Sequence, residues 1–315
     1  MSFFVFLFTV FLMVDVLTQK HISINVIRGL LVVYVLSMIG REFVSEASLK
    51  KIAKTILLLA ALLVVLQFFS VLVYGEVFFG VQYPTYIYPN SLMTFRYSPL
   101  NGDPNYFAYS LVPFVTVIIY YHFFAGQNGK VGSLYLFIGF VVVFFTMSRG
   151  ALLALLACYL LLWLAKCVKK GVSLRDFLMV IFFIITFIFL LLYLSKAREN
   201  NISNSSSQRI EILVRQVELV ENNFLLGHGL DNTKVVIGDS ILGPHNLFFE
   251  VLNGYGVIAL LVFLIPIIVV IYKNKGVGRY LAISFILASS FLGLLIYHPM
   301  WVFYHFVFLK VKNKK

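Results

Sequence analysis

Residues 195–244 have the sequence SKARENNISNSSSQRIEILVRQVELVENNFLLGHGLDNTKVVIGDSILGP and form one long polar segment in an otherwise apolar chain. Apolar runs stand on both sides of it, and the whole chain is 61% hydrophobic and 12% charged. A chain with so few charges is expected to place its functional groups where those charges gather, beside the apolar runs.

The composition of the 315 residues indicates a membrane protein. A mean hydropathy of +0.96 and an aromatic content of 17% exclude a soluble globular domain and a disordered chain. Runs of about 20 apolar residues, the length that crosses a bilayer, recur along the sequence. A transmembrane barrel would instead show weakly alternating segments of about ten residues. We therefore predict an all-α fold, a polytopic transmembrane helical bundle of about ten spans that forms a single integral membrane domain over residues 1–315. The expected spans cover residues 2–18, 22–40, 54–74, 105–124, 132–147, 150–166, 176–194, 246–272, 279–297 and 299–310.

The basic residues predict the topology. They cluster in short loops at residues 41–54, 166–175 and 273–279 and in the tail at 310–315. Lysine and arginine are enriched on the cytoplasmic side of membrane proteins, and all four clusters fall there if the N-terminus is cytoplasmic. Residues 195–244 are then one large periplasmic loop between the seventh and eighth spans of an inner-membrane protein. The net charge of +12 follows from this topology, and we expect no nucleic-acid partner.

A helical period runs through the loop over residues 207–224. Arg209 borders its apolar stripe and is expected to face the protein. Arg215 lies opposite, with Glu211 and Glu218 at i−4 and i+3, which is typical of a solvated helix pair. The stripe consists of Ile210, Leu213, Val214, Val217, Val220 and Phe224.

Three further polar features stand where apolar runs begin. Arg149 separates two runs, and its alternative role is a turn residue at the membrane interface with its stem on apolar surface. His245 and Asn246 precede the eighth span, and Asp103 and Asn105 open the fourth. In both pairs the alternative is an ordinary helix cap.

Together these groups suit a lipid-linked phosphate substrate. Guanidinium groups bind phosphate through paired N–H donors, and a neutral imidazole accepts a proton from a hydroxyl. The candidate catalytic residues are His245, Arg209 and Arg149. The candidate substrate-binding residues are Arg149, Arg209, Arg215, Asn246, Asp103 and Asn105.

An ordered set of motifs resembles the O-antigen polymerase and O-antigen ligase superfamily of bacterial envelope enzymes (Wzy-type). The resemblance covers roughly residues 95–275, the family-like catalytic region. Its motifs are Asp103-Pro104-Asn105, Ser148-Arg149-Gly150-Ala151-Leu152-Leu153-Ala154, Arg209-x-x-x-Leu213, Leu226-Gly227-His228-Gly229 and Pro244-His245-Asn246 with Gly256.

The resemblance implies a metal-independent glycosyltransferase that needs no cofactor. Its donor would be an oligosaccharide linked to undecaprenyl pyrophosphate, used on the periplasmic face. Arg149 and Arg209 would hold the pyrophosphate, and His245 would assist or orient the acceptor hydroxyl. The implied partners are this lipid-linked oligosaccharide, membrane lipid and a chain-length regulator protein. Family members usually have about two more N-terminal spans, so we expect this chain to be a fragment or a short variant.

Three functions remain open at this point. The first is a polymerase that joins lipid-linked repeat units of a surface polysaccharide, and the second is a ligase that transfers the glycan to lipid A–core. The third is a transporter or flippase of lipid-linked sugars, which would favour ionisable residues deep within spans and matched broken helices. Asp15 and Arg28 are the main such residues in the sequence.

Overall fold

The computed structural model divides the chain into two compact units, residues 45–203 with 312–315 and residues 204–311 with 1–44. The predicted spans 2–18 and 22–40, with Asp15 and Arg28, lie outside the described residues, and only residues 304 and 307 of the predicted span 299–310 are described. The structure describes residues 44–74, 83–84, 95–98, 103–124, 129–171, 174–199, 205–237, 240–291, 304, 307 and 311–312.

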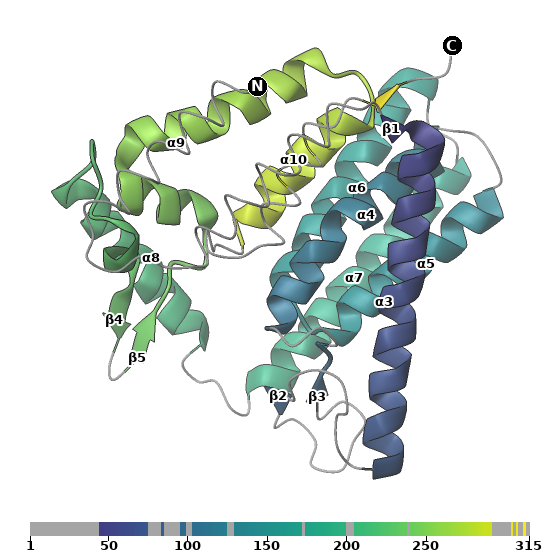
Figure 1. The fold of residues 1–315 in the computed structure, drawn as a ribbon. Helices are drawn as coiled ribbons and strands as arrows, with labels where there is room; N and C mark the ends of the chain where they lie inside the picture. Colours follow the sequence, from purple (N-terminus) through teal and green to yellow (C-terminus); the bar gives the residue numbers. More distant parts are fainter. Residues whose placement is uncertain are drawn as a thin grey trace. The chain divides into compact units, whose positions relative to one another are not determined.

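Long apolar helices build the unit formed by residues 45–203 (Figure 1). Helix α4 is central, because it packs against α3, α5 and α6 and its most apolar stretch is 78% buried, against 28% for α3. The close packing of α5 on α4 depends on Gly139, where an added Cβ would lie 2.8 Å from Cγ2 of Val115. The helices of this unit are α3 (Glu46–Tyr74), α4 (Pro104–Phe124), α5 (Gly129–Phe145), α6 (Arg149–Lys170) and α7 (Leu174–Glu199).

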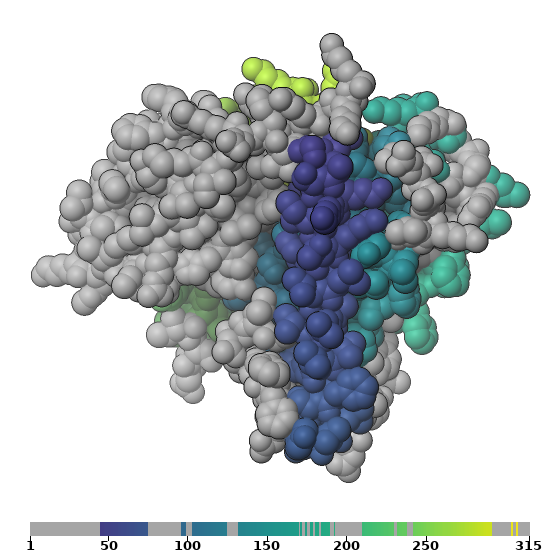
Figure 2. All heavy atoms as spheres, turned by 45° about the vertical axis from the view of Figure 1, so that its right-hand side comes forward, coloured from purple at the N-terminus to yellow at the C-terminus, as the bar shows by residue number. Residues whose placement is uncertain are grey.

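Helix α3 presents an apolar surface. Figure 2 shows it in purple along the face of its unit, and its outward side chains include Leu59, Leu62 and Phe69, each more than half exposed. Since water does not favour such a surface, its exposure fits a helix that faces lipid. The short antiparallel strands β2 (Tyr83–Pro84) and β3 (Phe95–Arg96) precede α4.

Residues 204–311 form a second arrangement, in which α8 and a small hairpin pack beside α9 and α10. Strands β4 and β5 pair antiparallel, with Val235 opposite Leu242. The aromatic rings of Phe263 and Phe285 join α9 to α10, with centroids 6.1 Å apart. The elements are α8 (Ser205–Asn222), the 3-10 helix η1 (Leu230–Thr233), β4 (Val235–Ile237), β5 (Ser240–Leu242), α9 (Leu247–Lys273) and α10 (Val277–Ser289). Two-residue strands β1 (Val44–Ser45) and β6 (Val311–Lys312) complete the described elements.

The described chain is mostly helical, as predicted, and its strands have only two or three residues. Four described helices, α3, α4, α6 and α9, are long and apolar enough to cross a membrane. Apolar stretches in α5, α7 and α10 are shorter. The total of about ten spans stays a prediction. The predicted eighth span differs in one respect, because α9 is not continuous but changes direction at Gly256 (φ 80°, ψ 177°).

Candidate functional site

The predicted site residues fall in both units. Asp103, Asn105 and Arg149 belong to residues 45–203, whereas Arg209, Arg215, His245 and Asn246 belong to residues 204–311. Except for Arg209, whose side chain is not described, the structure defines the surroundings of each group within its own unit. The convergence of Arg149, Arg209 and His245 on one cavity stays a prediction.

Arg149 is the first residue of α6 and is half-buried. A tight turn delivers it from α5, with the N–H of Met147 donating to the carbonyl of Phe144 at 2.8 Å. Ser148 stands at the N-cap without a side-chain capping bond, and its buried hydroxyl has no hydrogen-bond partner in the described structure. The N–H groups of a helix N-terminus attract anions, so the guanidinium and the start of α6 favour the same kind of ligand.

Arg96 is a further polar residue at this end of the unit. Its Nη2 donates to Oδ1 of Asn105 at 2.8 Å, and its Nε donates to the carbonyl of Thr146 at 3.1 Å. Arg96 thereby joins the start of α4 to the turn that delivers Arg149. Sequence reasoning missed it, although it is the single arginine between Arg41 and Arg149.

Tyr97 anchors the segment that carries Arg96. Its side chain is 1% exposed, and its ring packs edge-on against Phe145 with centroids 5.6 Å apart. Its N–H also donates to the carbonyl of Phe145 at 3.1 Å. Burial raises the pKa of the Tyr97 phenol to about 12, so this side chain stays neutral at physiological pH.

Asp103 caps α4, which was the predicted alternative to a role in substrate binding. Its Oδ1 accepts from the N–H of Asn105 at 2.7 Å, and its carbonyl accepts from Tyr106 and Phe107. Asn105 in turn accepts from Arg96. Both side chains therefore form hydrogen bonds that stabilise the unit, and their roles in substrate binding stay predictions.

The motif Leu226-Gly227-His228-Gly229 fills the break in α9. The N–H of His228 donates to the carbonyl of Asn253 at 2.6 Å, and the N–H of Gly229 donates to the carbonyl of Gly254 at 2.9 Å. From the other side, the N–H of Val257 donates to the carbonyl of Phe224 at 2.9 Å. A helix break leaves backbone groups without their helical partners, and this loop supplies the missing ones.

Two glycines permit that close approach. A Cβ added at Gly227 would lie 2.6 Å from the carbonyl carbon of Gly254, and one at Gly256 would overlap the backbone of Leu225. Both glycines also have positive φ, 73° and 80°, which other residues rarely adopt. In the sequence these glycines are motif positions without an evident role. The structure shows that they allow the two backbone segments at the break to contact each other.

A buried polar pair holds α8 to α9 next to this break. Asn253 donates to both the side-chain and the backbone oxygen of Gln216, and Gln216 donates to the carbonyl of Thr233 at 2.7 Å. Nε2 of His228 lies 2.8 Å from the carbonyl of Leu219. Because a carbonyl only accepts, Nε2 carries the proton, and His228 has a structural role.

Asn246 caps α9, again as the alternative for this residue predicted. Its Oδ1 accepts from the N–H groups of Phe248 and Phe249, and its Nδ2 donates to the carbonyl of Ser290 at 3.1 Å. His245 is exposed and has a φ of 48°. Glu250, which sequence reasoning missed, is buried in the first turn of α9, where a carboxylate complements the helix dipole.

Met147 and His245 share an unusual backbone conformation. They are the only non-glycine residues with positive φ in the described ranges, at 53° and 48°. Each stands next to a group of interest, since Met147 precedes Ser148 and Arg149, and His245 precedes Asn246. Left-handed backbone in a non-glycine residue costs on the order of 1–3 kcal/mol and is concentrated at functional sites.

The loop arginines differ in their environment. Arg215 is exposed and forms an ion pair with Glu218, Nη1 to Oε2 at 2.9 Å, which confirms the solvated helix pair. The hydrogen bond to Glu218 and its charge raise the pKa of Arg215, with a smaller contribution from Glu211. The backbone of Arg209 lies in α8, and its side chain lies outside the described part of the structure.

The sequence argument for Arg209 assumed that the apolar stripe of α8 faces the protein, whereas most of this stripe points outward. The face of α8 that packs inward carries Ile212 and Gln216, and Ile212 contacts Val235 and Ile237 of the hairpin in a small core. The stripe itself is exposed except for Val220, which is half-buried. Its period identified the helix correctly, but the face that turns inward is the one on which Gln216 bonds to Asn253 and Thr233. The argument from this stripe that turned Arg209 toward the protein is therefore lost.

Residues 134–264 match the sequence model of the Wzy_C family, whose description is O-Antigen ligase. The match confirms the resemblance to the O-antigen ligase and polymerase superfamily over this stretch, which contains Arg149, Arg209 and His245. Together with the apolar helices it indicates a membrane protein. No curated protein and no solved structure matches the chain.

Proposed function

We propose that this protein is a glycosyltransferase of the bacterial inner membrane that polymerises surface polysaccharide on the periplasmic face. The donor is a glycan repeat unit on undecaprenyl pyrophosphate, and the acceptor is a second lipid-linked unit. The observation that carries the proposal is the match to the O-Antigen ligase family over residues 134–264, which includes an arginine at the N-terminus of α6 and a histidine at the start of α9.

The proposed reaction is a displacement at the anomeric carbon of the donor. The acceptor hydroxyl oxygen forms a bond to this carbon while the bond to the pyrophosphate oxygen breaks. The hydroxyl proton goes to His245, and undecaprenyl pyrophosphate leaves with the bonding electron pair. Arg149 and Arg209 stabilise the charge that grows on this leaving group, which is electrostatic catalysis. In this scheme guanidinium groups supply the positive charge, so no metal ion is required.

Structural features support a role for Arg149 in this scheme. Its place at the start of α6 adds backbone N–H donors to the guanidinium group. Arg96 ties the preceding turn to α4 through two hydrogen bonds, which limits the movement of the turn. A group that must meet a developing charge gains from such positioning, since reorganisation costs are avoided.

The second candidate function is the ligase that transfers the finished glycan to lipid A–core. The description of the matched family, O-Antigen ligase, favours it. Donor and leaving group are the same in both reactions, so the same residues serve either. The third candidate, a transporter of lipid-linked sugars, would move the donor without forming a glycosidic bond. A broken helix such as α9 occurs in transporters, but its break is filled by the loop Phe224–Gly229.

Reconstitution distinguishes the three candidates. The purified protein is placed in proteoliposomes with lipid-linked repeat units extracted from a strain that lacks this gene. A ladder of longer glycans without added acceptor indicates the polymerase, and a product that requires lipid A–core indicates the ligase. Transfer of the donor across the bilayer without a new bond indicates the transporter and overturns the proposal. Arg149→Ala is the inactive comparison, and Lys234→Ala, at an exposed lysine, is the matched control.

A further inference from the structure

Helix α8 exposes its apolar residues. Their side chains follow one stripe of the helix and are between 43% and 66% exposed, and the exposed apolar residues continue beyond the helix end at Asn222 with Phe224, Leu225 and Leu226. The exposed members of the stripe are Ile210, Leu213, Val214, Val217 and Phe224. A contiguous apolar surface of this kind marks an interaction site.

The inward face of α8 is not the apolar one. Gln216 is fully buried there and bonds to Asn253 and Thr233, and Ile212 is the apolar residue beside it. A helix on the surface of a water-soluble protein has the opposite arrangement, with its apolar stripe toward the core. The arrangement in α8 is therefore suited to an apolar environment outside the unit.

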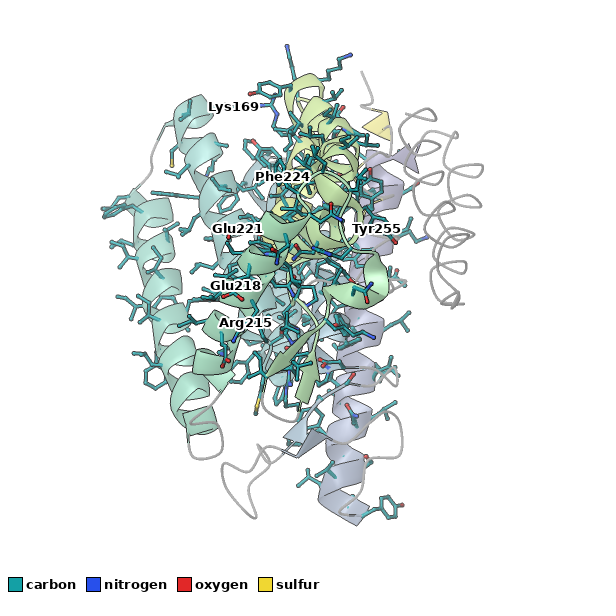
Figure 3. All side chains as sticks on the ribbon, turned by 90° about the vertical axis from the view of Figure 1, so that its left-hand side faces the viewer. Lys169, Arg215, Glu218, Glu221, Phe224 and Tyr255 are labelled. Atoms are coloured by element: carbon teal, nitrogen blue, oxygen red, sulfur yellow. The ribbon has the colours of Figure 1, made fainter. Side chains whose placement is uncertain are left out.

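The polar flank of α8 is separate from the stripe. Arg215 and Glu218 form their ion pair there, and Glu211 is exposed beside them. Figure 3 shows Arg215, Glu218 and Glu221 following one another along the helix, with Phe224 just beyond its end. Glu221, which is also exposed, lies between Ile210 and Val214 by helical position, so one carboxylate interrupts the stripe near the C-terminal end of α8. Since this flank carries more acidic than basic residues, burial of the stripe and not attraction to anionic lipid would hold the helix in place.

The position of Phe224 indicates which apolar environment this is. Its carbonyl accepts from Val257, the first residue of α9 after the break. From Val257 to Lys273 the helix is about 25 Å long, from about 17 residues at 1.5 Å each, which is near the lower limit for crossing a bilayer. This stretch exposes Ile258, Leu261 and Ile265. The stripe of α8 thus ends where the apolar span of α9 begins.

We propose that α8 lies in the lipid–water interface of the membrane, with its apolar stripe in the boundary between headgroups and acyl chains. Amphipathic helices bury their apolar faces about 5–10 Å deep in this boundary. The occupant of the stripe is then lipid. This inference goes beyond the proposed reaction and does not depend on it, because it concerns the depth of α8 and not its chemistry.

Fluorescent labels on full-length protein in proteoliposomes test the depth. Cys158 and Cys167 are first replaced by alanine, and single cysteines are then introduced by Leu213→Cys and Val217→Cys on the stripe. Glu211→Cys and Glu218→Cys on the same helix are the matched controls. We expect stripe labels to be quenched by brominated lipids and to be roughly threefold less accessible to aqueous iodide than the control labels, because only the stripe is buried in the boundary.

Two results would overturn the proposal. Stripe labels that iodide quenches as strongly as the control labels would place the stripe in water. Stripe labels protected from both quenchers would show that protein covers the stripe. The measurement is then repeated with one copy of the protein per nanodisc. Protection that is lost there indicates a second copy of the protein, and protection that persists indicates another segment of the same chain. If the cysteine variants do not fold, a lipid with a photoreactive acyl chain is applied to the unmodified protein and tests whether the stripe contacts acyl chains. Labelling of residues 210–224 supports the proposal, and its absence contradicts it.

Discussion

The backbone N–H of His228 donates a 2.6 Å hydrogen bond to the carbonyl of Asn253, across the break in α9. The imidazole of His228 is at the same time bonded to the carbonyl of Leu219. The histidine of the glycine-rich motif is therefore part of the contact that closes the break. His245, which is exposed at the start of α9, remains the candidate for proton transfer.

We expect Gly256→Ala to destabilise the protein by roughly 2–4 kcal/mol, from left-handed strain and overlap with Leu225. Gly227→Ala should have a similar effect, because its Cβ would meet Gly254. Gly243→Ala is the control, since nothing lies within 4 Å of its Cβ. Thermal unfolding in detergent measures the three variants. Equal melting temperatures for Gly256→Ala and Gly243→Ala would show that the break is not tightly closed.

Arg96→Ala should lower stability and activity together, because it removes both bonds that connect α4 to the turn before Arg149. A double-mutant cycle with Asn105→Ala isolates one of these bonds. We expect a coupling of about 1.5–3 kcal/mol in unfolding free energy, typical of a hydrogen bond with a charged donor. Arg96→Lys should restore part of the stability but less of the activity, since an ammonium lacks the planar fork that fixes the turn. Additive effects of the two substitutions would contradict this connection.

Arg209→Ala should reduce polysaccharide assembly by roughly a hundredfold if it contacts the leaving group. Arg209→Lys should also fail, because bidentate binding of phosphate requires a planar fork. Arg215→Ala should change little, since its partner is the exposed Glu218. The measurement is glycan chain length on a gel after complementation of a deletion strain, with protein level checked. An inactive Arg215→Ala variant together with an active Arg209→Ala variant would assign the leaving-group contact to Arg215 and not to Arg209.

His245→Gly should separate stability from activity. Glycine adopts positive φ without the penalty of roughly 1 kcal/mol that other residues pay. This gain offsets the loss of the interactions of the His245 side chain, so we expect a melting temperature close to that of the parent protein. It should nevertheless be inactive, because it lacks the proton acceptor. His245→Asn, which also tolerates left-handed backbone, serves as a second inactive but stable variant. Melting temperature and polymer formation are measured on the same preparations, and full activity of either variant would exclude His245 from proton transfer.

Sequence patterns predicted the features that depend on neighbours along the chain. The apolar runs predicted the long helices α3, α4, α6 and α9, because bilayer thickness sets the length of a spanning helix. The spacing of Arg215 and Glu218 predicted their ion pair, since residues three apart share a helix face. Asp103 and Asn246 were also recognised as possible caps, which bond to N–H groups two or three residues away.

Contacts between distant residues decided the rest. The backbone of Leu225 lies against the break at Gly256. The residues next to Gly256 in the sequence do not predict this contact with a distant segment. The inward face of α8 likewise depends on distant residues, because Gln216 bonds there to Asn253 and Thr233, and the period of the apolar stripe does not reveal these partners. Arg96 connects α4 to the turn before Arg149 because the fold brings Thr146 and Asn105, which are distant in sequence from each other, within hydrogen-bond distance of it. Periodicity identifies a helix and its faces, but the partners that each face meets are chosen by the tertiary structure.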